Sequence, residues 1–123
     1  MLGATLVAAT IPVSDLERSK AFYGDILGLT PLGENPASIQ YGCGDTSQLS
    51  IFRRPGTPTV HTLAHFEVAD IAAVIADLEA KGVEFVDITE GPLVTTNHVA
   101  QVGPALGAWF HDPDGNTLGL RQA

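Results

Sequence analysis

The sequence predicts an α+β fold built from two copies of one strand–helix–strand unit, and three observations support this prediction. Residues 13–16 (VSDL) recur as residues 68–71 (VADI), 55 positions further along the chain. Residues 28–29 (GL) recur as residues 82–83 (GV), 54 positions further along. The order of the predicted elements around these motifs repeats as well. A generic strand-to-helix junction, the alternative explanation, accounts for the first motif but leaves the repeated order unexplained.

The first half of the chain is predicted to form a strand, a helix and three more strands. Residues 5–13 (TLVAATIPV) are apolar and β-branched, which is typical of a buried strand. Ser14 is a good N-cap, and Asp15 suits the first turn of a helix that ends at Gly28. Residues typical of turns separate the strands that follow, which we expect at about 30–34, 38–43 and 48–53.

The second half repeats this order after a connection rich in proline and glycine. The elements expected there are a strand at 60–68, a helix at 70–81 that ends at Gly82, a strand at about 83–88, a strand within 99–110 and a last strand at 117–121. The long loop 89–98 either covers a binding site or is disordered. The sequence DPDG at 112–115 has the residue types that a type I turn prefers.

The bulk composition describes one acidic globular domain. Hydrophobic residues make up 45% of the 123 residues and charged residues 16%, which allows a core without disulfides. The net charge is −8 with six Lys and Arg, so no basic cluster is present to bind nucleic acid. No run approaches the ~20 apolar residues that cross a bilayer. A lone cysteine, Cys43, fits a reducing cytoplasm. We therefore expect a cytoplasmic protein with neither nucleic-acid nor membrane partners.

Three segments carry a family resemblance: VSDLERSKAFYGDILGLTPL (13–32), HFEVADI (65–71) and AWFHDPDGNTLGL (108–120). In this order they resemble the vicinal oxygen chelate superfamily, also called the glyoxalase/bleomycin-resistance/dioxygenase family. The resemblance implies one domain of two βαβββ modules, about 1–54 and 60–123. Their sheets would form a curved, U-shaped mixed sheet around a trough, with the helices outside. It also implies a homodimer, in which the trough closes either within one chain or between two.

The resemblance also locates four positions at which metal-dependent members place a ligand, mostly His, Gln or Glu. In this sequence those positions hold Ala8, Ser50, Leu63 and Gly119. None of them supplies a nitrogen, carboxylate or thiolate donor, and the Ser50 hydroxyl is a weak ligand. We therefore expect no metal and no cofactor. Glyoxalase, extradiol dioxygenase and fosfomycin-transferase activities, which in this family use a metal to polarise oxygens, are disfavoured.

Relocated metal ligands are the alternative. His61 and His65 share a face if both lie on one strand. They would then be ~13 Å apart, too far to bind one ion together. A relocated site would need one of them with Glu67 or His98.

Alternation of side chains along the strands predicts which residues line the trough. The predicted ligand-binding residues are Tyr41, Gln48, Ser50, Phe52, His61, Leu63, His65, Trp109 and Arg121. Apolar and aromatic groups with a few polar ones are typical of a small-molecule pocket. Tyr41 and Trp109 either stack on a planar ligand or pack in the core. A bulge would exchange the faces of Trp109 and Phe110.

Two classes of function follow from these residues. The first is a metal-free binding protein that sequesters an antibiotic, or another planar or amphipathic small molecule, and so confers antibiotic resistance. The second is an enzyme of lyase, isomerase or dioxygenase type. It would use His65, His61 or Glu67 for acid–base chemistry, either without metal or with relocated metal ligands.

Overall fold

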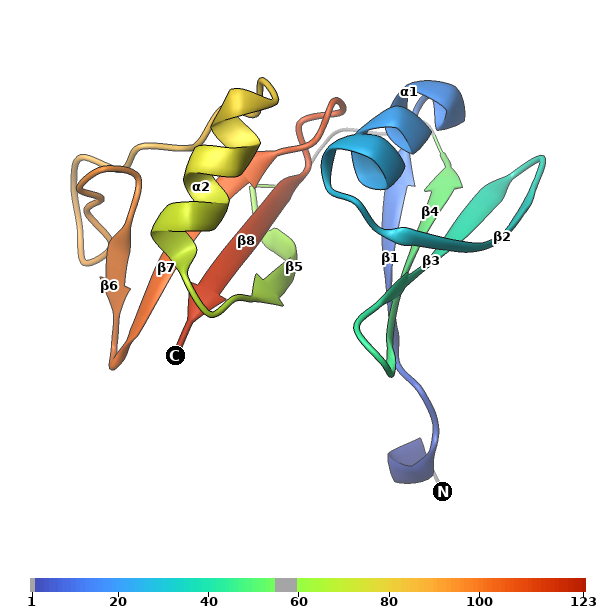
Figure 1. Cartoon of the computed structure of the whole chain (residues 1–123), viewed down its shortest axis with the longest axis horizontal. Helices are drawn as coiled ribbons and strands as arrows, with labels where there is room; N and C mark the ends of the chain where they lie inside the picture. The colour runs from blue at the N-terminus through green and yellow to red at the C-terminus, as the bar shows by residue number, and fades with distance from the viewer. Residues whose placement is uncertain (1, 55–59) are drawn as a thin grey trace. The chain divides into compact units, whose positions relative to one another are not determined.

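The computed structural model describes residues 2–54 and 60–123 of the chain. The chain divides into two units, Met1–Thr57 and Pro58–Ala123. Each unit holds one four-stranded mixed sheet with a helical segment packed on one face (Figure 1). The predicted α+β class and the repeated order of elements are therefore confirmed. A single U-shaped sheet that runs through both units remains an expectation from the family resemblance.

The first unit has its strands in the spatial order β1-β4-β3-β2, with β1 parallel to β4 and the other pairs antiparallel. Its elements are the 3-10 turn η1 (Leu2–Ala4), β1 (Ala8–Val13), α1 (Leu16–Lys20), the π-helix η2 (Ala21–Ile26), β2 (Thr30–Asn35), β3 (Ser38–Cys43) and β4 (Ser47–Arg53). The first strand is shorter than the expected 5–13. Because Ala8 pairs with Gln48 and β4 begins at Ser47, residues 5–7 run past the end of their partner strand.

The helix of the first unit begins one residue later than the sequence predicts. Asp15, rather than Ser14, is the N-cap, and its carboxylate accepts a hydrogen bond from the Arg18 backbone N–H at 3.1 Å. Ser14 instead accepts a hydrogen bond at Oγ from the Arg18 guanidinium, at 3.0 Å. The helix ends at Gly28, as predicted, where φ is +75°.

The second part of this helix is wound as a π-helix, which the sequence did not predict. Over Ala21–Ile26 the wider turn places the neighbouring aromatic residues Phe22 and Tyr23 together in the core. Their rings meet edge to face, with centroids 5.2 Å apart. The rest of this core comes from one face of the sheet: Ile11, Val13, Ile39, Tyr41, Leu49 and Ile51.

The second unit has the spatial order β5-β8-β7-β6, with β5 parallel to β8. Its elements are β5 (Thr62–Glu67), α2 (Ile71–Ala80), β6 (Ala100–Val102), β7 (Ala105–His111) and β8 (Thr117–Gln122). Asp70 caps α2 by accepting a hydrogen bond from the Ala73 backbone N–H at 3.1 Å. Helix α2 packs across β7 and β8 (Figure 1). The helix predicted over 70–81 and its stop at Gly82 are confirmed.

The strand expected at 83–88 is wrong. Phe85 makes one isolated bridge to Phe110, and the Val86 backbone N–H donates to the Trp109 carbonyl at 2.8 Å. The short strand β6 pairs with the first half of β7 and occupies the rest of that edge. Phe85 packs its ring 5.4 Å from Phe110, so this segment contributes to the core rather than to the sheet.

Both predicted loops of the second unit are ordered by local hydrogen bonds. In the loop 89–98, Thr96 and Val99 form an antiparallel bridge, and Asn97 and His98 adopt positive φ between them. In the hairpin turn at 112–115, the Asp112 carboxylate accepts from the backbone N–H groups of Asp114 and Asn116. No helix in the described part of the chain is long and apolar enough to cross a bilayer.

Candidate functional site

The helix-free face of the second sheet, opposite α2, gathers most of the residues predicted to bind a ligand in this half of the chain. Strand pairing places its residues in two rows that run from β5 through β8 to β7: His65, Gly119 and Trp109, then Glu67, Arg121 and Gly107. The alternate positions carry the buried core on the side of α2, where Gln122 accepts a hydrogen bond from the Ile71 backbone N–H at 2.8 Å.

Trp109 lies on this face, and Phe110 is fully buried on the side of α2. The pairing of β7 with β8 is regular, so no bulge exchanges the two side chains. A Cβ atom at Gly119 would lie 3.5 Å from Trp109 Cδ1, and one at Gly107 would lie 3.4 Å from Trp109 Cη2. The indole therefore reaches across both glycines, with its pyrrole edge against Gly119 and its benzene edge against Gly107.

A line of three polar side chains lies on the same face as the indole, on β5 and β8. Arg121 donates from Nη1 to both carboxylate oxygens of Glu67, at 2.9 and 3.1 Å. His65 Nε2 lies 3.4 Å from Glu67 Oε1. The Arg121 guanidinium, followed by the His65 ring, holds the pKa of the Glu67 carboxyl below its usual value. The three side chains are 41–58% exposed, so this line is solvated rather than buried.

The helix-free face of the first sheet, opposite α1, is mostly polar. Three predicted residues lie on it and are half-buried: Gln48, Ser50 and Phe52. Pairing places Thr10 and Gln40 on either side of Ser50. Gln40 Nε2 lies 3.5 Å from Ser50 Oγ and donates to Ser38 Oγ at 3.0 Å. Thr10 and Gln40 are not among the residues predicted from the sequence, although both occupy alternating strand positions on the same face as Ser50.

Tyr41 does not share this face, which corrects the predicted lining. It pairs with Leu49, whereas Gln40 pairs with Ser50, so the Tyr41 side chain points to the helix side of the sheet. There it is fully buried, with its ring 6.5 Å from that of Tyr23. Burial raises the pKa of its hydroxyl, and the hydroxyl has no hydrogen-bond partner in the described part of the chain. Tyr41 is a core residue that cannot stack on a ligand.

The two remaining predicted residues lie at the start of β5. His61 precedes the strand and is exposed. Leu63 is half-buried and sits at an irregular step in the pairing of β5 with β8, between Thr62 and Ala64. Neither residue belongs to the two regular rows around Trp109.

The residues at the family's metal positions do not fit a metal ion. Ala8, Leu63 and Gly119 carry no donor atom, and Ser50 offers only a neutral hydroxyl. At Gly119 a Cβ would already lie 3.3 Å from the Cβ of His65, close to the indole as well. Within residues 2–54 and 60–123, no group of three or more His, Cys, Asp or Glu side chains could hold a metal ion.

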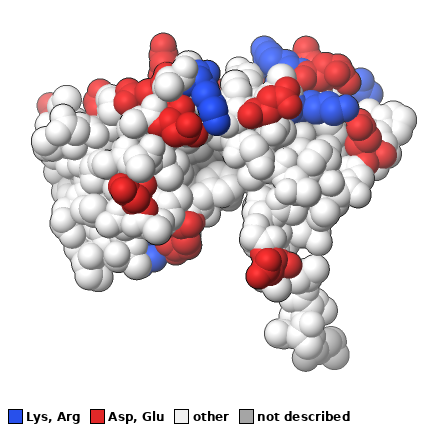
Figure 2. Space-filling model, in the orientation of Figure 1, with Lys and Arg blue, Asp and Glu red and all other residues white. Residues whose placement is uncertain are grey.

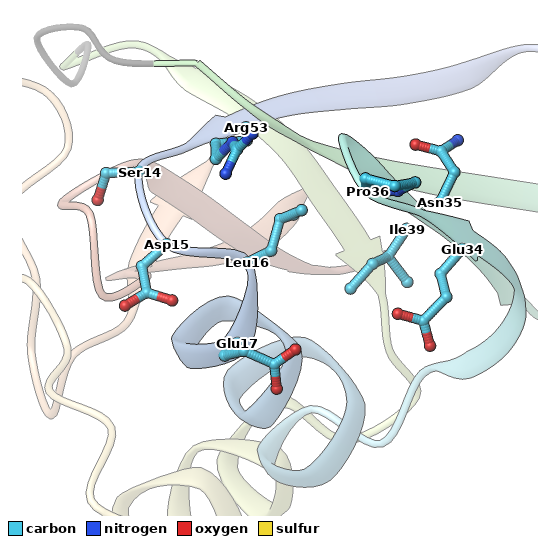
Figure 3. A pocket seen from close by; sticks show the side chains of 9 residues that line it. All are labelled: Ser14, Asp15, Leu16, Glu17, Glu34, Asn35, Pro36, Ile39 and Arg53. Carbon is cyan, nitrogen blue, oxygen red and sulfur yellow. The ribbon is translucent and has the colours of Figure 1, made fainter.

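A hollow of about 510 Å³ lies elsewhere in the first unit, where α1 begins beside the turn between β2 and β3 (Figure 3). Its lining contains none of the predicted ligand-binding residues: Ser14, Asp15, Leu16, Glu17, Glu34, Asn35, Pro36, Ile39 and Arg53. Several of its polar groups already have structural partners. Asp15 caps α1, and Glu34 pairs with Lys20 at 3.1 Å.

Basic side chains are few and mixed with acidic ones. On the face shown in Figure 2, Lys and Arg lie next to Asp and Glu rather than in a separate basic patch. Lys20 pairs with Glu34, and Lys81 pairs with Asp77 at 3.2 Å. This distribution lacks the clustered positive charge that phosphate-backbone binding uses.

Comparisons with known proteins identify the family of this chain and the solved structures that it resembles. The model of the Glyoxalase/Bleomycin resistance protein/Dioxygenase superfamily matches residues 5–120. Among solved structures, the chain is similar to TnmS3, an antibiotic binding protein from Streptomyces sp. CB03234, with 26% identity and a TM-score of 0.74 over 99% of this chain and 98% of that chain. It is similar to a glyoxalase/bleomycin resistance protein from the same organism, with 26% identity and a TM-score of 0.70 over 96% and 100%.

A likeness in fold alone extends to lactoylglutathione lyase from Agrobacterium tumefaciens. That structure is 18% identical, with a TM-score of 0.72 over 98% of this chain and 94% of that chain. No curated protein sequence matches the chain.

Proposed function

Because this chain belongs to the glyoxalase/bleomycin resistance protein/dioxygenase superfamily, we propose that it binds a small planar or amphipathic molecule without a metal ion and sequesters an antibiotic. One observation carries the proposal. The indole of Trp109 lies against Gly107 and Gly119 on the helix-free face of the second sheet. The second of these glycines stands where metal-dependent relatives would be expected to place a ligand.

The chemistry of this face supports binding by stacking. Trp109 is half-buried, so part of the indole remains available to a ligand. An aromatic ring stacked on it gains about 1 kcal/mol beyond the burial of apolar surface. Arg121, Glu67 and His65 provide the small number of polar groups that orient a ligand in a mostly apolar site. The similarity to TnmS3, an antibiotic binding protein, supports an antibiotic as the natural ligand.

A thermal-shift screen of planar aromatic antibiotics, run with and without a chelator, tests this proposal. A ligand at 100 times its Kd stabilises the protein by about 2.7 kcal/mol, which raises the Tm by roughly 5–10 °C. We expect the same shift with and without EDTA, and a much smaller shift for Trp109→Leu. Phe66→Leu, an aromatic-to-aliphatic change on the helix side of the same sheet, serves as the matched control. A shift that requires a divalent metal, or one that Trp109→Leu leaves unchanged, would contradict the proposal.

A second candidate function is acid–base catalysis, and the contact between His65 and Glu67 favours it. A general base needs a pKa near the working pH and a position beside the substrate proton. Arg121 lowers the pKa of Glu67 instead of raising it, so Glu67 is a weak proton acceptor. The candidate then depends on His65 alone. Turnover of a bound compound that stops in His65→Gln, while its Kd is unchanged, would establish the catalytic function.

We also propose that the protein is a homodimer in the cytoplasm. The family resemblance supports the dimer, and the lone cysteine fits a reducing compartment. Light scattering after size-exclusion chromatography should give twice the monomer mass. A monomer mass at micromolar concentration would overturn the dimer.

A further inference from the structure

We infer that the ligand of the second sheet is a planar aromatic molecule whose edge carries an acceptor oxygen, a carboxylate or a carbonyl, and that Trp109 and Arg121 select it together. The inference rests on the proposed function, and it names the class of ligand and the residues that determine specificity. Two independent features of the helix-free face support it: the space that two glycines leave, and the unused donors of one arginine.

The two glycines under the indole are not required by the backbone. Gly107 lies inside β7 and Gly119 inside β8, and neither is among the glycines with positive φ. A glycine inside a strand weakens the strand, because it adds flexibility and no side-chain packing. What these two positions supply is space. A Cβ at Gly107 would lie 3.0 Å from Val102 Cγ2 and 3.4 Å from the indole, so the Val102 side chain would have to give by a few tenths of an ångström.

The consequence is a flat aromatic platform. Because neither glycine has a side chain, the indole can lean along the sheet toward Gly107 instead of projecting straight out from it. A flat indole presents its ring face to a ligand, and offset stacking then favours planar, conjugated molecules over saturated ones. A methyl group at Gly119 would lie 3.3 Å from His65 Cβ and 3.5 Å from Trp109 Cδ1, so it would fill the space beside the indole and press on His65.

Arg121 supplies directed hydrogen-bond donors beside the platform. Both of its contacts with Glu67 use Nη1, at 2.9 and 3.1 Å. Its Nε and Nη2 groups have no hydrogen-bond partner within residues 2–54 and 60–123. Arginine keeps its proton at all ordinary pH values, so these groups can donate but never accept. They match an acceptor oxygen, whereas a ligand that carries an ammonium group brings only donors to them.

Gly107 connects the two features. It pairs with Arg121 across the ladder and lies against the benzene edge of Trp109. No side chain therefore stands between the base of Arg121 and the indole. Adjacent strands are about 4.8 Å apart, so a ligand stacked on Trp109 must extend about one strand spacing, over β8, to bring its acceptor to the guanidinium. Glu67, on β5 at the other side of β8, holds the guanidinium there.

The test uses three small probes and the NMR signal of the indole N–H. Trp109 is the only tryptophan in the sequence, so this signal reports the platform without ambiguity. The probes are 2-naphthoate, 2-naphthylmethylammonium and cyclohexanecarboxylate. We expect 2-naphthoate to bind at least tenfold more tightly than either of the others, since it alone combines the planar ring with the acceptor.

Two pairs of variants separate the contributions. Arg121→Gln should weaken 2-naphthoate binding about tenfold and leave the ammonium probe unchanged or slightly tighter. Arg53→Gln, an exposed arginine of the first unit, is its control. Gly119→Ala should weaken both naphthyl probes severalfold and shift the indole signal in the free protein. Gly33→Ala is its control, because a Cβ there meets only Gln40 Oε1, at an ordinary 3.9 Å.

Each outcome decides one of the two claims. If a naphthyl probe shifts the Trp109 signal but Arg121→Gln leaves the ratio of carboxylate to ammonium affinities unchanged, the inferred ligand class is wrong and small-molecule binding stands. If 2-naphthoate does not bind although a planar antibiotic shifts the Tm, the inferred class is again wrong. If no planar compound of any charge moves the indole signal, both the inference and the proposed function are overturned.

Discussion

His98 is joined to Asp87 by a short contact, with 2.8 Å between the imidazole Nδ1 and the carboxylate Oδ1. The other ring nitrogen, Nε2, lies 3.2 Å from Glu79 Oε2 on α2. The loop that ends at His98 is therefore fastened to the helix side of the second unit. The sequence left two alternatives for the loop 89–98: disorder, or a cover over the binding site. These contacts do not match a disordered loop, and an end that is held in this way does not match a cover that opens freely.

This pair predicts a pH-dependent stability. The hydrogen bond to Asp87, and then the charges of Asp87 and Glu79, raise the pKa of His98 above its usual value. A raised folded-state pKa stabilises the protein fully below the unfolded pKa of about 6.5, and this stabilisation is lost as the pH rises through the folded pKa. Urea unfolding of wild type and His98→Asn should differ by roughly 0.5 kcal/mol at pH 5.5 and by less at pH 9.

Asparagine is the suitable replacement, because it tolerates the positive φ of 70° found at His98. Asp87→Asn should lower the pKa of His98 in an NMR titration. An equal difference in stability at both pH values, or an unchanged pKa in Asp87→Asn, would show that the contact does not act electrostatically.

Tyr41→Phe should leave stability unchanged or raise it by about 1 kcal/mol. The Tyr41 hydroxyl is buried and has no hydrogen-bond partner in the described part of the chain, so its removal relieves a desolvation cost. Tyr41→Ala should instead cost about 3–5 kcal/mol, because it opens a cavity. Chemical denaturation measures both values. A large loss of unfolding free energy in Tyr41→Phe would mean that the hydroxyl has a hydrogen-bond partner. A loss of ligand binding in this variant would mean that Tyr41 belongs to the binding site.

The two N-caps should be equivalent, as the repeat implies. Asp15→Ala and Asp70→Ala each remove a carboxylate that accepts a backbone N–H at 3.1 Å, and each should cost about 1 kcal/mol of unfolding free energy. Ser14→Ala should cost clearly less, because the Ser14 hydroxyl accepts a side-chain donor instead. If Ser14→Ala costs more than Asp15→Ala, Ser14 is the N-cap after all.

Arg121→Gln should raise the pKa of Glu67 toward the ordinary value of a glutamate. Arg121 is the main cause of the lowered pKa, through its hydrogen bond, and His65 adds a smaller effect. A depressed carboxyl pKa stabilises the folded state above the unfolded pKa, and this stabilisation is lost as the pH falls through the folded value. Carboxyl chemical shifts followed between pH 2 and 7 measure the change. An unshifted Glu67 titration would indicate that the pair does not persist in solution.

The sequence was sufficient to predict the elements whose signals are local. The strand-to-helix motif fixed both N-terminal helix boundaries to within one residue, and the glycine stops were right, because capping and positive φ depend on neighbours in the chain. The π-helix and the missing strand at 83–88 depend on tertiary packing. The sequence could not show that Phe22 and Tyr23 both enter the core, or that Phe85 packs on Phe110.

The residues of the candidate site could be predicted only where the sequence indicates which side chains of a strand share a face. Alternation placed Ser50 and Phe52 on one face, and His65, Trp109 and Arg121 on another, because these strands pair regularly. Tyr41 failed because its assignment depended on the register of β3 against β4, which the sequence does not fix. Gly119 was noticed only as a missing metal ligand. That Gly119 leaves room for the indole follows only from the structure, which places Trp109 beside it.

The most direct test of metal-free binding is calorimetric titration of a planar aromatic antibiotic into the protein, with and without EDTA. We predict one Kd under both conditions, and a Kd at least tenfold weaker for Trp109→Leu, since stacking on the indole beside Gly107 and Gly119 supplies the affinity. Binding that disappears with EDTA and returns with a divalent metal, or binding unaffected by Trp109→Leu, would contradict it.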